Sequence, residues 1–533
     1  MTVRTRDVLR DRQQWGGSAL VSTGSSAATL AGLHALREGG NAFDAAVIAS
    51  AVMTVAMPMA SGPAGDVAAV LHVRGQREAW SLTGLGCAPG GGSRAEFSNR
   101  GMRTVPDRGI LSASTPGTMA AWYTLARAHC TMPMRRLLQP AIELAERGVV
   151  VTQQAARWFG DNMHVLDAGF KEAFNVRNEP PNVGSTLFQP GLARLYEMLG
   201  DDPHRTESVV DAAVLRVSEA LNGLFQRGDC RITDGAVLEP ALVADVAGRR
   251  IAVNCAPTQG ALLLQNLLAY ARLVAPGSGC TGENIHLLSE VVHRSFAWRL
   301  ANLGDPGHTG VVEALAKPVI DDIVAGVNRA HRSSTTYTQH YSHGDTTHLT
   351  VVDKAGNSVS WVQSLGLGFG AGVGVPALGL LLSNRLGRSS TLVDTDPNCV
   401  SAGRRPVNTI FAWSASDEGG VRWLGGTPGG DGQCQWNAQV LAAMLIHGES
   451  ALGALNAPRW TYLPGADKHE ANRSPSLEVD RDLPSAVVAD LQSRGHDVRL
   501  RASVGGAVRL THVAGTYRYG LDDGRQEGLT AGF

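Results

Sequence analysis

Two adjacent threonines, Thr346 and Thr347, open the segment TTHLTVVD, whose composition is that of a strand ready to be buried. The preceding residues, 318–345, are polar, rich in Ser, Thr and His, and without an apolar period, so we expect an exposed loop. If the chain were cut before Thr346, its hydroxyl would lie beside a free α-amine with a pKa of about 8, which could serve as its base. An ordinary strand entrance is the alternative.

The same hydroxyl could make the cut by attacking the carbonyl of Asp345, which gives an ester that water then opens. A second hydroxyl is predicted nearby. The turn-forming cluster DKAGN, residues 353–357, separates two strand-like runs and predicts a hairpin in which Val352 faces Ser358. Counting outward places Thr346 opposite Ser364. A surface Thr–Ser pair between neighbouring strands is the alternative.

Beyond Ser364, the segment GLGFGAGVG has glycine at every even position from Gly366 to Gly374. If it is extended, it presents a bare backbone face next to the hydroxyl pair, with room for a substrate. A glycine-rich loop is the alternative.

Composition limits the class of protein. The chain has 533 residues, 44% of them hydrophobic, and a net charge of −1, so it can build a large core and has no basic excess for nucleic acid. Its 7 cysteines show neither CxxC spacing nor a partner histidine cluster, which predicts neither a zinc site nor disulfides. The N-terminus lacks an apolar leader, and the most apolar run, from Ala45, is broken by Pro58. We therefore expect a cytoplasmic protein with no membrane span.

Helical periods precede and follow the hairpin. Helices are predicted within residues 22–40, 39–58, 134–148, 435–448 and 483–496. The run 39–58 has no polar face, so it must lie between other layers. Strands between helical layers, with antiparallel pairing, predict sheets covered by helices.

Several segments, in order along most of the chain, resemble the γ-glutamyltransferase (γ-glutamyltranspeptidase) family of N-terminal nucleophile hydrolases. These segments are GGNAFDAAV, TTHLTVVDKAGNSVSWVQS, GTPGGDGQ, NAPRW and DDGRQEG. The resemblance implies an α/β fold, a four-layer αββα sandwich with antiparallel central sheets. It also implies one domain in two segments, 1–345 as the large subunit and 346–533 as the small subunit.

The resemblance assigns roles to particular residues. It makes Thr346 the nucleophile and the new N-terminus after cleavage, with Thr347 following it and Ser364 contacting it. Gly429 and Gly430 match the paired glycines whose N–H groups form the oxyanion hole. Glycine suits that role because a side chain would obstruct the approach of backbone donors.

The sequence departs from the family where a γ-glutamyl group would be recognised. Leu85 stands in place of a carboxylate-binding arginine, Gly366 in place of an asparagine, and Arg385 in place of a Gln or Glu that would meet the substrate ammonium. An arginine there would repel an ammonium and attract a carboxylate. The pair Asn408–Thr409 ends in threonine and in this resembles the family's oxamate-amidohydrolase-like branch, whereas the glutathione branch has a serine pair at this place. A surface salt bridge is the alternative for Arg385.

These observations predict a self-cleaving hydrolase that splits an acyl bond, an amide in the first instance, in a small carboxylate-bearing acid of oxalyl type. The alternatives are carbon–carbon cleavage of an oxalyl group in alkylproline antibiotic biosynthesis, true γ-glutamyl hydrolysis or transfer, and an uncleaved binding protein. The resemblance implies no metal or organic cofactor. It implies a heterodimer of the large and small segments, alone or paired with a second copy.

Overall fold

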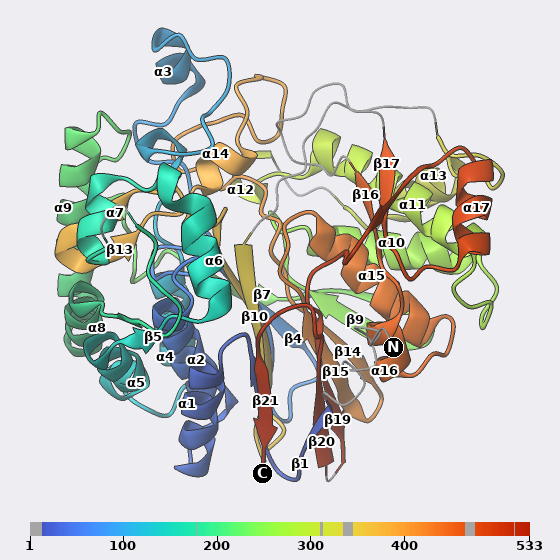
Figure 1. The fold of residues 1–533 in the computed structure, drawn as a ribbon, viewed down its shortest axis with the longest axis horizontal. Coiled ribbons are helices and arrows are strands. Elements are labelled where there is room, and N and C mark those ends of the chain that lie inside the picture. The colour runs from blue at the N-terminus through green and yellow to red at the C-terminus, as the bar shows by residue number, and fades with distance from the viewer. Residues whose placement is uncertain (1–12, 177–178, 310–312, 334–344, 464–474, 516) are drawn as a thin grey trace.

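The computed structural model of the protein describes residues 13–176, 179–309, 313–333, 345–463, 475–515 and 517–533. In this part of the chain, two seven-stranded antiparallel sheets lie face to face between two layers of helices (Figure 1). The predicted four-layer αββα sandwich is confirmed.

The first sheet, called sheet A, has the strand order β1-β20-β19-β15-β14-β9-β8. Its strands are β1 (Gln13–Gly16), β20 (Tyr517–Asp522), β19 (Arg509–Ala514), β15 (Gly420–Gly426), β14 (Trp413–Asp417), β9 (Arg249–Val253) and β8 (Leu242–Val246). The second, sheet B, has the order β21-β2-β10-β11-β3-β4-β7. Its strands are β21 (Leu529–Gly532), β2 (Leu20–Thr23), β10 (Asp345–Val352), β11 (Ser358–Gly366), β3 (Asp66–His72), β4 (Ala79–Gly84) and β7 (Val237–Pro240).

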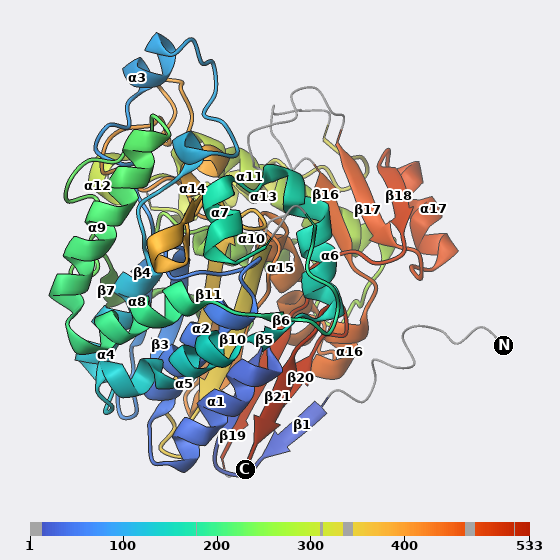
Figure 2. The same ribbon diagram turned by 60° about the vertical axis from the view of Figure 1, so that its left-hand side comes forward.

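Each sheet buries its outer face under its own helices, as the two views show (Figures 1 and 2). Sheet B is covered by α1 (Ser26–Arg37), α2 (Ala42–Ala56), α4 (Thr118–His129), α5 (Met134–Arg147), α8 (Pro190–Asp201) and α9 (Pro203–Ala220). Sheet A is covered by α10 (Gly260–Leu273), α11 (Gly282–Asn302), α15 (Gly432–Leu445), α16 (Ala451–Asn456) and α17 (Ser485–Ser493). The five predicted helices are therefore confirmed as α1, α2, α5, α15 and α17.

Smaller elements surround this core. They are α3 (Arg94–Asn99), α6 (Gln153–Asn162), α7 (Ala168–Ala173), α12 (Pro306–Thr309), α13 (Lys317–Ala325), α14 (Arg385–Ser389), β5 (Val149–Val150), β6 (Thr186–Leu187), β12 (Gly374–Val375), β13 (Leu380–Leu381), β16 (Trp460–Leu463), β17 (Ser476–Asp480) and β18 (Asp497–Arg501). In the described residues, no helix combines the length and the apolar character needed to cross a membrane.

Helix α2 lies under the centre of sheet B, and its start is fixed by a buried carboxylate. Asn41 caps the helix, and the Asp44 side chain accepts a hydrogen bond from the Asn41 N–H at 2.8 Å. Asp44 also accepts from the N–H groups of Thr131 and Met132, at 2.9 and 3.0 Å, and from the Thr131 hydroxyl. One carboxylate therefore joins α2 to the start of α5.

The hairpin of β10 and β11 has the predicted register, with Val352 paired with Ser358. Its turn is closed by side chains, because Asp353 accepts hydrogen bonds from the Asn357 N–H at 3.0 Å and from its amide at 2.7 Å. β10 and β11 each have a strand on both sides, β2 and β3 respectively, so both are interior strands of sheet B.

The space between the sheets holds small and hydroxyl-bearing side chains. Residues at even positions of β10 and β11 face sheet A: Thr350 bonds Thr511 at 2.6 Å, and Ser360 donates to the Gly425 carbonyl at 2.9 Å. Odd positions, such as Leu349, join the core under the helices. The inner layer can therefore accommodate polar groups without breaking either apolar core.

The exposed loop predicted over residues 318–345 is wrong in its first part. Helix α13 forms there, with a proline in its first turn and with Ile320 and Ile323 buried against α10 and α11. The polar composition concealed two apolar residues at helical spacing. Residues 334–344 lie outside the described part of the chain.

The extended glycine wall is also wrong, and the alternative of a glycine-rich loop is confirmed. Gly370 and Gly372 have φ values of 59° and 72°, which an extended strand does not contain, and Phe369 has φ 61°. Phe369 is fully buried against Phe159, with ring centroids 4.7 Å apart. Burial of this aromatic ring, rather than strand pairing, sets the path of the segment.

We expect Asp44→Ala to lower the free energy of unfolding by about 3 kcal/mol, because it leaves several buried N–H groups without an acceptor. The measurement is chemical denaturation followed by circular dichroism. The matched control is Asp161→Ala, which removes a carboxylate 66% exposed at the end of α6 and should change stability by less than about 0.5 kcal/mol. Equal effects of the two changes would contradict the capping role of Asp44.

Candidate active site

The two predicted hydroxyls meet at one end of sheet B. Thr346 donates a hydrogen bond from Oγ1 to Ser364 Oγ at 3.2 Å, and Ser364 Oγ also accepts from the Gly366 N–H at 2.9 Å. Thr346 is 5% exposed and Ser364 is 1% exposed. The surface Thr–Ser pair is therefore excluded by burial, and the counted pairing is confirmed.

A β-bulge lies at the same point. The register shifts between Asp345 and Thr347, so Ser364 and Leu365 together oppose the single residue Thr346. Bulges re-aim side chains and bend a strand, and they are common next to active sites. The extra residue lies on β11, so this strand bends directly opposite Thr346.

Thr347 lies on the other face of β10. Its hydroxyl contacts the sulfur atoms of Met53 and Met57, at 3.5 and 3.8 Å, in the layer of α2. An added Cβ at Gly24 would come within 2.6 Å of this hydroxyl. The structure therefore separates Thr347 from the Thr346–Ser364 pair.

His348 follows on the inner face, and its environment locates the glycine pair. Its Nε2 lies 3.0 Å from Ser360 Oγ, and its ring packs on Gly426, where a Cβ would come within 2.6 Å. Burial, with a smaller effect of Arg509, lowers the pKa of His348 well below its usual value, so the ring is neutral at pH 7. Gly425 of β15 contacts Ser360, and the next residue, Gly426, contacts His348. From Gly425 to Gly426, β15 therefore runs toward the end of β10 that carries Thr346.

Gly429 and Gly430 continue from β15 in that direction, immediately before α15. Their φ values are 119° and 57°, and a Cβ on Gly429 would lie 2.2 Å from the Trp436 ring. Glycine is therefore required at Gly429 both by the backbone angle and by the close aromatic neighbour. The positive end of the α15 dipole at this turn favours a negative charge nearby.

Asp66 is the centre of a buried polar cluster on the strand next to Ser364. The two residues are direct partners in the β3–β11 pairing. Asp66 Oδ1 accepts from the Gly86 N–H at 2.8 Å, and Oδ2 accepts from Arg385 Nε and the Asn408 amide, both at 3.0 Å. Thr346, Ser364 and Asp66 thus form a polar row across three adjacent strands.

Arg385 is therefore part of an ion pair, but not of a surface one. Its side chain is 1% exposed and that of Asp66 is 0% exposed. A guanidinium buried to this degree needs a carboxylate partner, since isolated charges are costly in a protein interior. The alternative interpretation of Arg385, a salt bridge at the surface, is therefore wrong, because the salt bridge is buried.

Asn408 and Thr409 are tied to the glycine pair by Gln259. The Gln259 N–H donates to the Asn408 carbonyl at 3.0 Å, and its amide donates to the carbonyls of Thr409 and Gly430, at 3.0 and 3.3 Å. Arg299 donates to Gln259 Oε1 at 3.1 Å. A continuous polar network therefore connects the Asp66 cluster to the Gly429–Gly430 turn.

Leu85 packs among small apolar residues between the sheets, including Val362 and Ile410, and is 5% exposed. Gly366 has φ 96°, and a Cβ there would meet Asn384 Oδ1 at 2.2 Å. That oxygen accepts the Leu367 N–H at 2.9 Å. The predicted space at Gly366 is therefore occupied by Asn384.

Sequence reasoning missed two parts of this site. Asp66 was not among the predicted site residues, although an aspartate at the start of the apolar run VAAVLHV is a signal for a buried partner. Gln259 carried no recognisable signal. A hollow of about 1050 Å³ lies at the other end of the sheets, around Lys354 and Gly356, and so is not part of this site.

The sequence profile of the family described as Gamma-glutamyltranspeptidase matches residues 28–533. The chain belongs to this family. The family comprises hydrolases and transferases, and the protein is an enzyme of that class. The predicted resemblance is thereby confirmed.

Two curated relatives align over nearly the whole chain. The oxamate amidohydrolase proenzyme of Klebsiella pneumoniae is 28% identical, with 95% of this chain and 97% of the relative covered. The glutathione hydrolase proenzyme of Escherichia coli is 26% identical, with 96% and 92% covered. The solved structure of LmbA2991HD superposes with a TM-score of 0.85 at 26% identity, with 100% of each chain covered.

The Asp66–Arg385 pair makes a prediction about stability. Asp66→Asn and Arg385→Met should each cost about 3–5 kcal/mol, because each leaves the opposite charge buried without its partner. The double variant should be more stable than the sum of the two losses implies. Thermal or chemical denaturation of the four proteins measures the coupling.

The exposed pair Arg135–Asp201, with side chains 59% and 57% exposed, is the matched control. Its coupling should be much weaker than that of the buried pair, because solvent screens both charges. If the buried pair coupled no more strongly than this one, Asp66 would not be the partner that stabilises Arg385.

Proposed function

We propose that the protein is a self-processing hydrolase in which Thr346, freed as an N-terminus, attacks the acyl carbon of a small carboxylate-bearing substrate of oxalyl type. The observation that carries the proposal is the buried Thr346–Ser364 hydroxyl pair at 3.2 Å, at the first residues of an interior strand. The two relatives named above are both proenzymes, which supports activation by cleavage.

In the proposed cleavage of substrate, Thr346 Oγ1 adds to the acyl carbon while its own α-amine takes the hydroxyl proton. The carbon–nitrogen bond of an amide substrate then breaks, and the amine proton passes to the leaving nitrogen. Water opens the resulting ester, which releases the acid and restores Thr346. Ser364 orients the nucleophile, and the N–H groups of Gly429 and Gly430 stabilise the oxyanion.

Processing uses the same hydroxyl, but the Thr346 nitrogen is still part of the peptide bond and cannot serve as the base. Thr346 Oγ1 attacks the Asp345 carbonyl, the C–N bond breaks as the ester forms, and the hydroxyl proton ends on the nitrogen, which becomes the α-amine. Water then hydrolyses the ester and separates a large segment, 1–345, from a small segment, 346–533. Both segments stay in one domain, because β10 and β11 of the small segment lie between β2 and β3 of the large one.

The substrate class is proposed from the charges around the site. Arg385, at the start of α14, binds Asp66 on the strand next to Ser364 and so brings a positive charge close to the hydroxyl pair. A substrate carboxylate would be attracted to this guanidinium. The buried, apolar Leu85 offers nothing to an α-carboxylate. An oxalyl acid, which has no ammonium, fits these residues better than a γ-glutamyl group, in keeping with the oxamate amidohydrolase relative.

The purified chain should separate into two fragments whose smaller member begins TTHLTVVD when sequenced from its N-terminus. Thr346→Ala should abolish cleavage, and Thr346→Ser should retain part of it, because an oxygen nucleophile remains. Ser364→Ala should slow cleavage about tenfold, the effect of roughly one hydrogen bond to the nucleophile. Denaturing gels over time give the rates.

Thr347→Val is the matched control, since it removes the neighbouring hydroxyl on the other face of β10 and should leave cleavage nearly unchanged. Normal cleavage of the Thr346→Ala variant would refute the assignment of Thr346 as the nucleophile. So would a wild-type chain that stays intact on long incubation.

The processed enzyme should hydrolyse an oxalyl amide such as oxamate and show little turnover of γ-glutamyl-p-nitroanilide. A buried ammonium beside Arg385 would be unpaired, which costs several kcal/mol and so several orders of magnitude in kcat/KM. The assay compares kcat/KM for both compounds and for a 2-oxo acid whose cleavage breaks a carbon–carbon bond. Preference for the 2-oxo acid would favour the alternative bond, and efficient γ-glutamyl turnover would contradict the pocket assignment.

Arg385→Gln should raise KM for the best substrate, but it also leaves Asp66 unpaired. The double variant Asp66→Asn/Arg385→Gln separates the two effects, because it removes both charges. If stability returns while KM stays high, Arg385 binds substrate. If KM returns as well, its role is structural only.

A further inference from the structure

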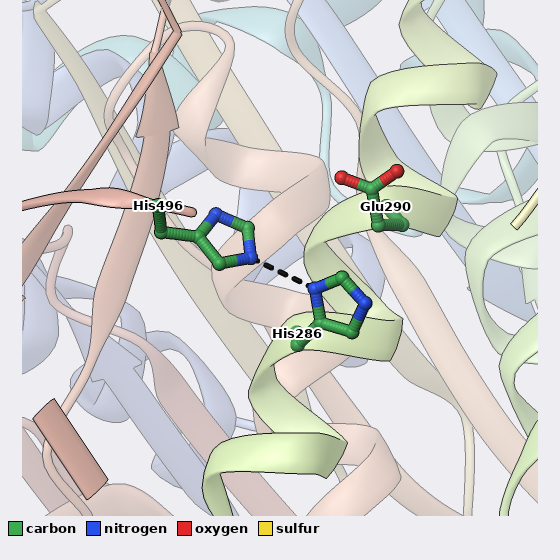
Figure 3. A group of neighbouring side chains, drawn as sticks. All are labelled: His286, Glu290 and His496. Atoms are coloured by element: carbon green, nitrogen blue, oxygen red, sulfur yellow. Dashed lines mark hydrogen bonds between the residues drawn. The ribbon is translucent and has the colours of Figure 1, made fainter. Parts of the chain in front are cut away.

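A second polar cluster lies in the helical layer over sheet A. His286 and Glu290 stand one turn apart on α11, and His496 follows α17 (Figure 3). All three residues are buried, at 0%, 1% and 6% exposure. One ligand atom from each, an imidazole nitrogen or a carboxylate oxygen, lies within 4.8 Å of the other two.

Hydrogen bonds orient the His286 ring. Its Nε2 lies 2.8 Å from the carbonyl oxygen of Asn328, and since a carbonyl only accepts, Nε2 carries the hydrogen. In the neutral ring the lone pair is then on Nδ1, which lies 2.8 Å from His496 Nε2. This is the arrangement found at metal sites, where the second ring nitrogen of a ligand donates to a carbonyl.

The backbone holds His496 in place. Gly495 ends α17 with φ 88° and donates its N–H to the Gln492 carbonyl at 2.9 Å. The His496 N–H donates to the Leu491 carbonyl at 3.1 Å, which completes a Schellman motif. The imidazole therefore projects from a fixed position toward α11.

Glu290 is fixed by the chain on its other side. Its Oε2 accepts the Ser333 N–H at 2.9 Å, which leaves Oε1 as the oxygen available to a further ligand. Burial raises the pKa of the Glu290 carboxyl, while the Ser333 N–H and the nearby charges of Arg294 and Arg332 act in the opposite direction. Arg332 and Arg494 also act electrostatically on the histidines of the cluster. These positive charges oppose a nearby cation, so we expect only moderate affinity, on the order of micromolar.

We propose that His286 Nδ1, His496 Nε2 and Glu290 form a binding site for a divalent transition metal, Zn²⁺ in the first instance, with water as the fourth ligand. Two imidazoles and one carboxylate are a ligand set that Zn²⁺ takes in tetrahedral sites. Binding requires His496 to change tautomer: the hydrogen on Nε2, which faces His286 Nδ1, leaves as another is taken up on Nδ1, so the imidazole stays neutral and presents a lone pair to the metal.

The geometry needs only a small adjustment. Ligands about 2.0–2.1 Å from Zn²⁺ in a tetrahedron are about 3.3 Å apart, so the two imidazole nitrogens must separate by about 0.5 Å. Rotation of the Glu290 carboxylate brings its oxygen closer. Both changes are within the freedom of side chains on fixed backbones.

The site is coupled to the stretch that precedes the β10 strand. Its outer contacts, the Asn328 carbonyl and the Ser333 N–H, belong to residues 328–333, the described segment closest before Asp345. Metal binding would therefore fasten this end of the 1–345 segment onto α11. This inference stands whether or not the chain is cut at Thr346.

The test uses the full chain, freed of metal by a chelator and titrated with ZnCl₂ by calorimetry, with CoCl₂ as a spectroscopic probe. We expect one equivalent of Zn²⁺ bound with micromolar affinity, a visible absorption band of tetrahedral Co²⁺, and a higher melting temperature with Zn²⁺. Glu290→Gln and His496→Gln should each weaken binding about a hundredfold and abolish the band.

The matched control is His34→Gln. His34 and Glu38 are also four residues apart, with Nε2 and Oε1 separated by 3.0 Å, but they lie on the solvent-exposed face at the end of α1. Its loss should change neither affinity nor the band. Glu290→Gln keeps an acceptor for Ser333, so its metal-free melting temperature should stay close to wild type. Absence of saturable binding at one equivalent, or binding unchanged in both cluster variants, would overturn the proposal and leave a hydrogen-bonded histidine pair.

Discussion

The register between β10 and β11 is the constraint on which the site depends. Both strands are interior strands of a sheet with two buried faces. A slip of β10 by one residue would move Thr346 into the apolar core under α2, away from Ser364, and bring Leu349 and Val351 between the sheets. The side-chain-closed turn at Asp353 and the pairing to both neighbours remove that freedom. Only at its open end, where the bulge lies, does the pairing depart from regularity.

Much of this hairpin could be predicted because its determinants are local. The turn residues Asp353 and Asn357 and the alternation of the flanking runs are all within twenty residues, and they fix the Thr346–Ser364 pairing by counting. Helix α2 could be predicted equally well, because a long apolar run that begins with the capping residues Asn41 and Asp44 is typical of a buried helix. The glycine loop after Gly366 was not, because the burial of Phe369 against distant helices decides its path.

Sequence patterns could not predict which charged groups of the site pair with each other. Asp66 and Arg385 are more than three hundred positions apart, and composition says nothing about which acid will meet which base. The histidine of α11 and that beyond α17 are separated by 210 residues. In each case the sheets and their helical covers bring the groups together, and only the assembled layers reveal that the charge is compensated.

The two sheets are woven from both ends of the chain. In sheet A, β1, β8 and β9 come from before residue 345 and the four strands between them from after it, while in sheet B the segments alternate again. The Phe533 carbonyl accepts hydrogen bonds from the N–H groups of Ser18 and Ala19, which joins the last residue to the start of β2. Once the chain has been cut, this topology makes refolding a different process from the original folding. Folding of the intact chain is a unimolecular search, whereas two pieces once unravelled would have to find each other and interleave strand by strand. After a cut at the start of β10, the fold would therefore be maintained by the height of its unfolding barrier rather than by a reversible folding equilibrium.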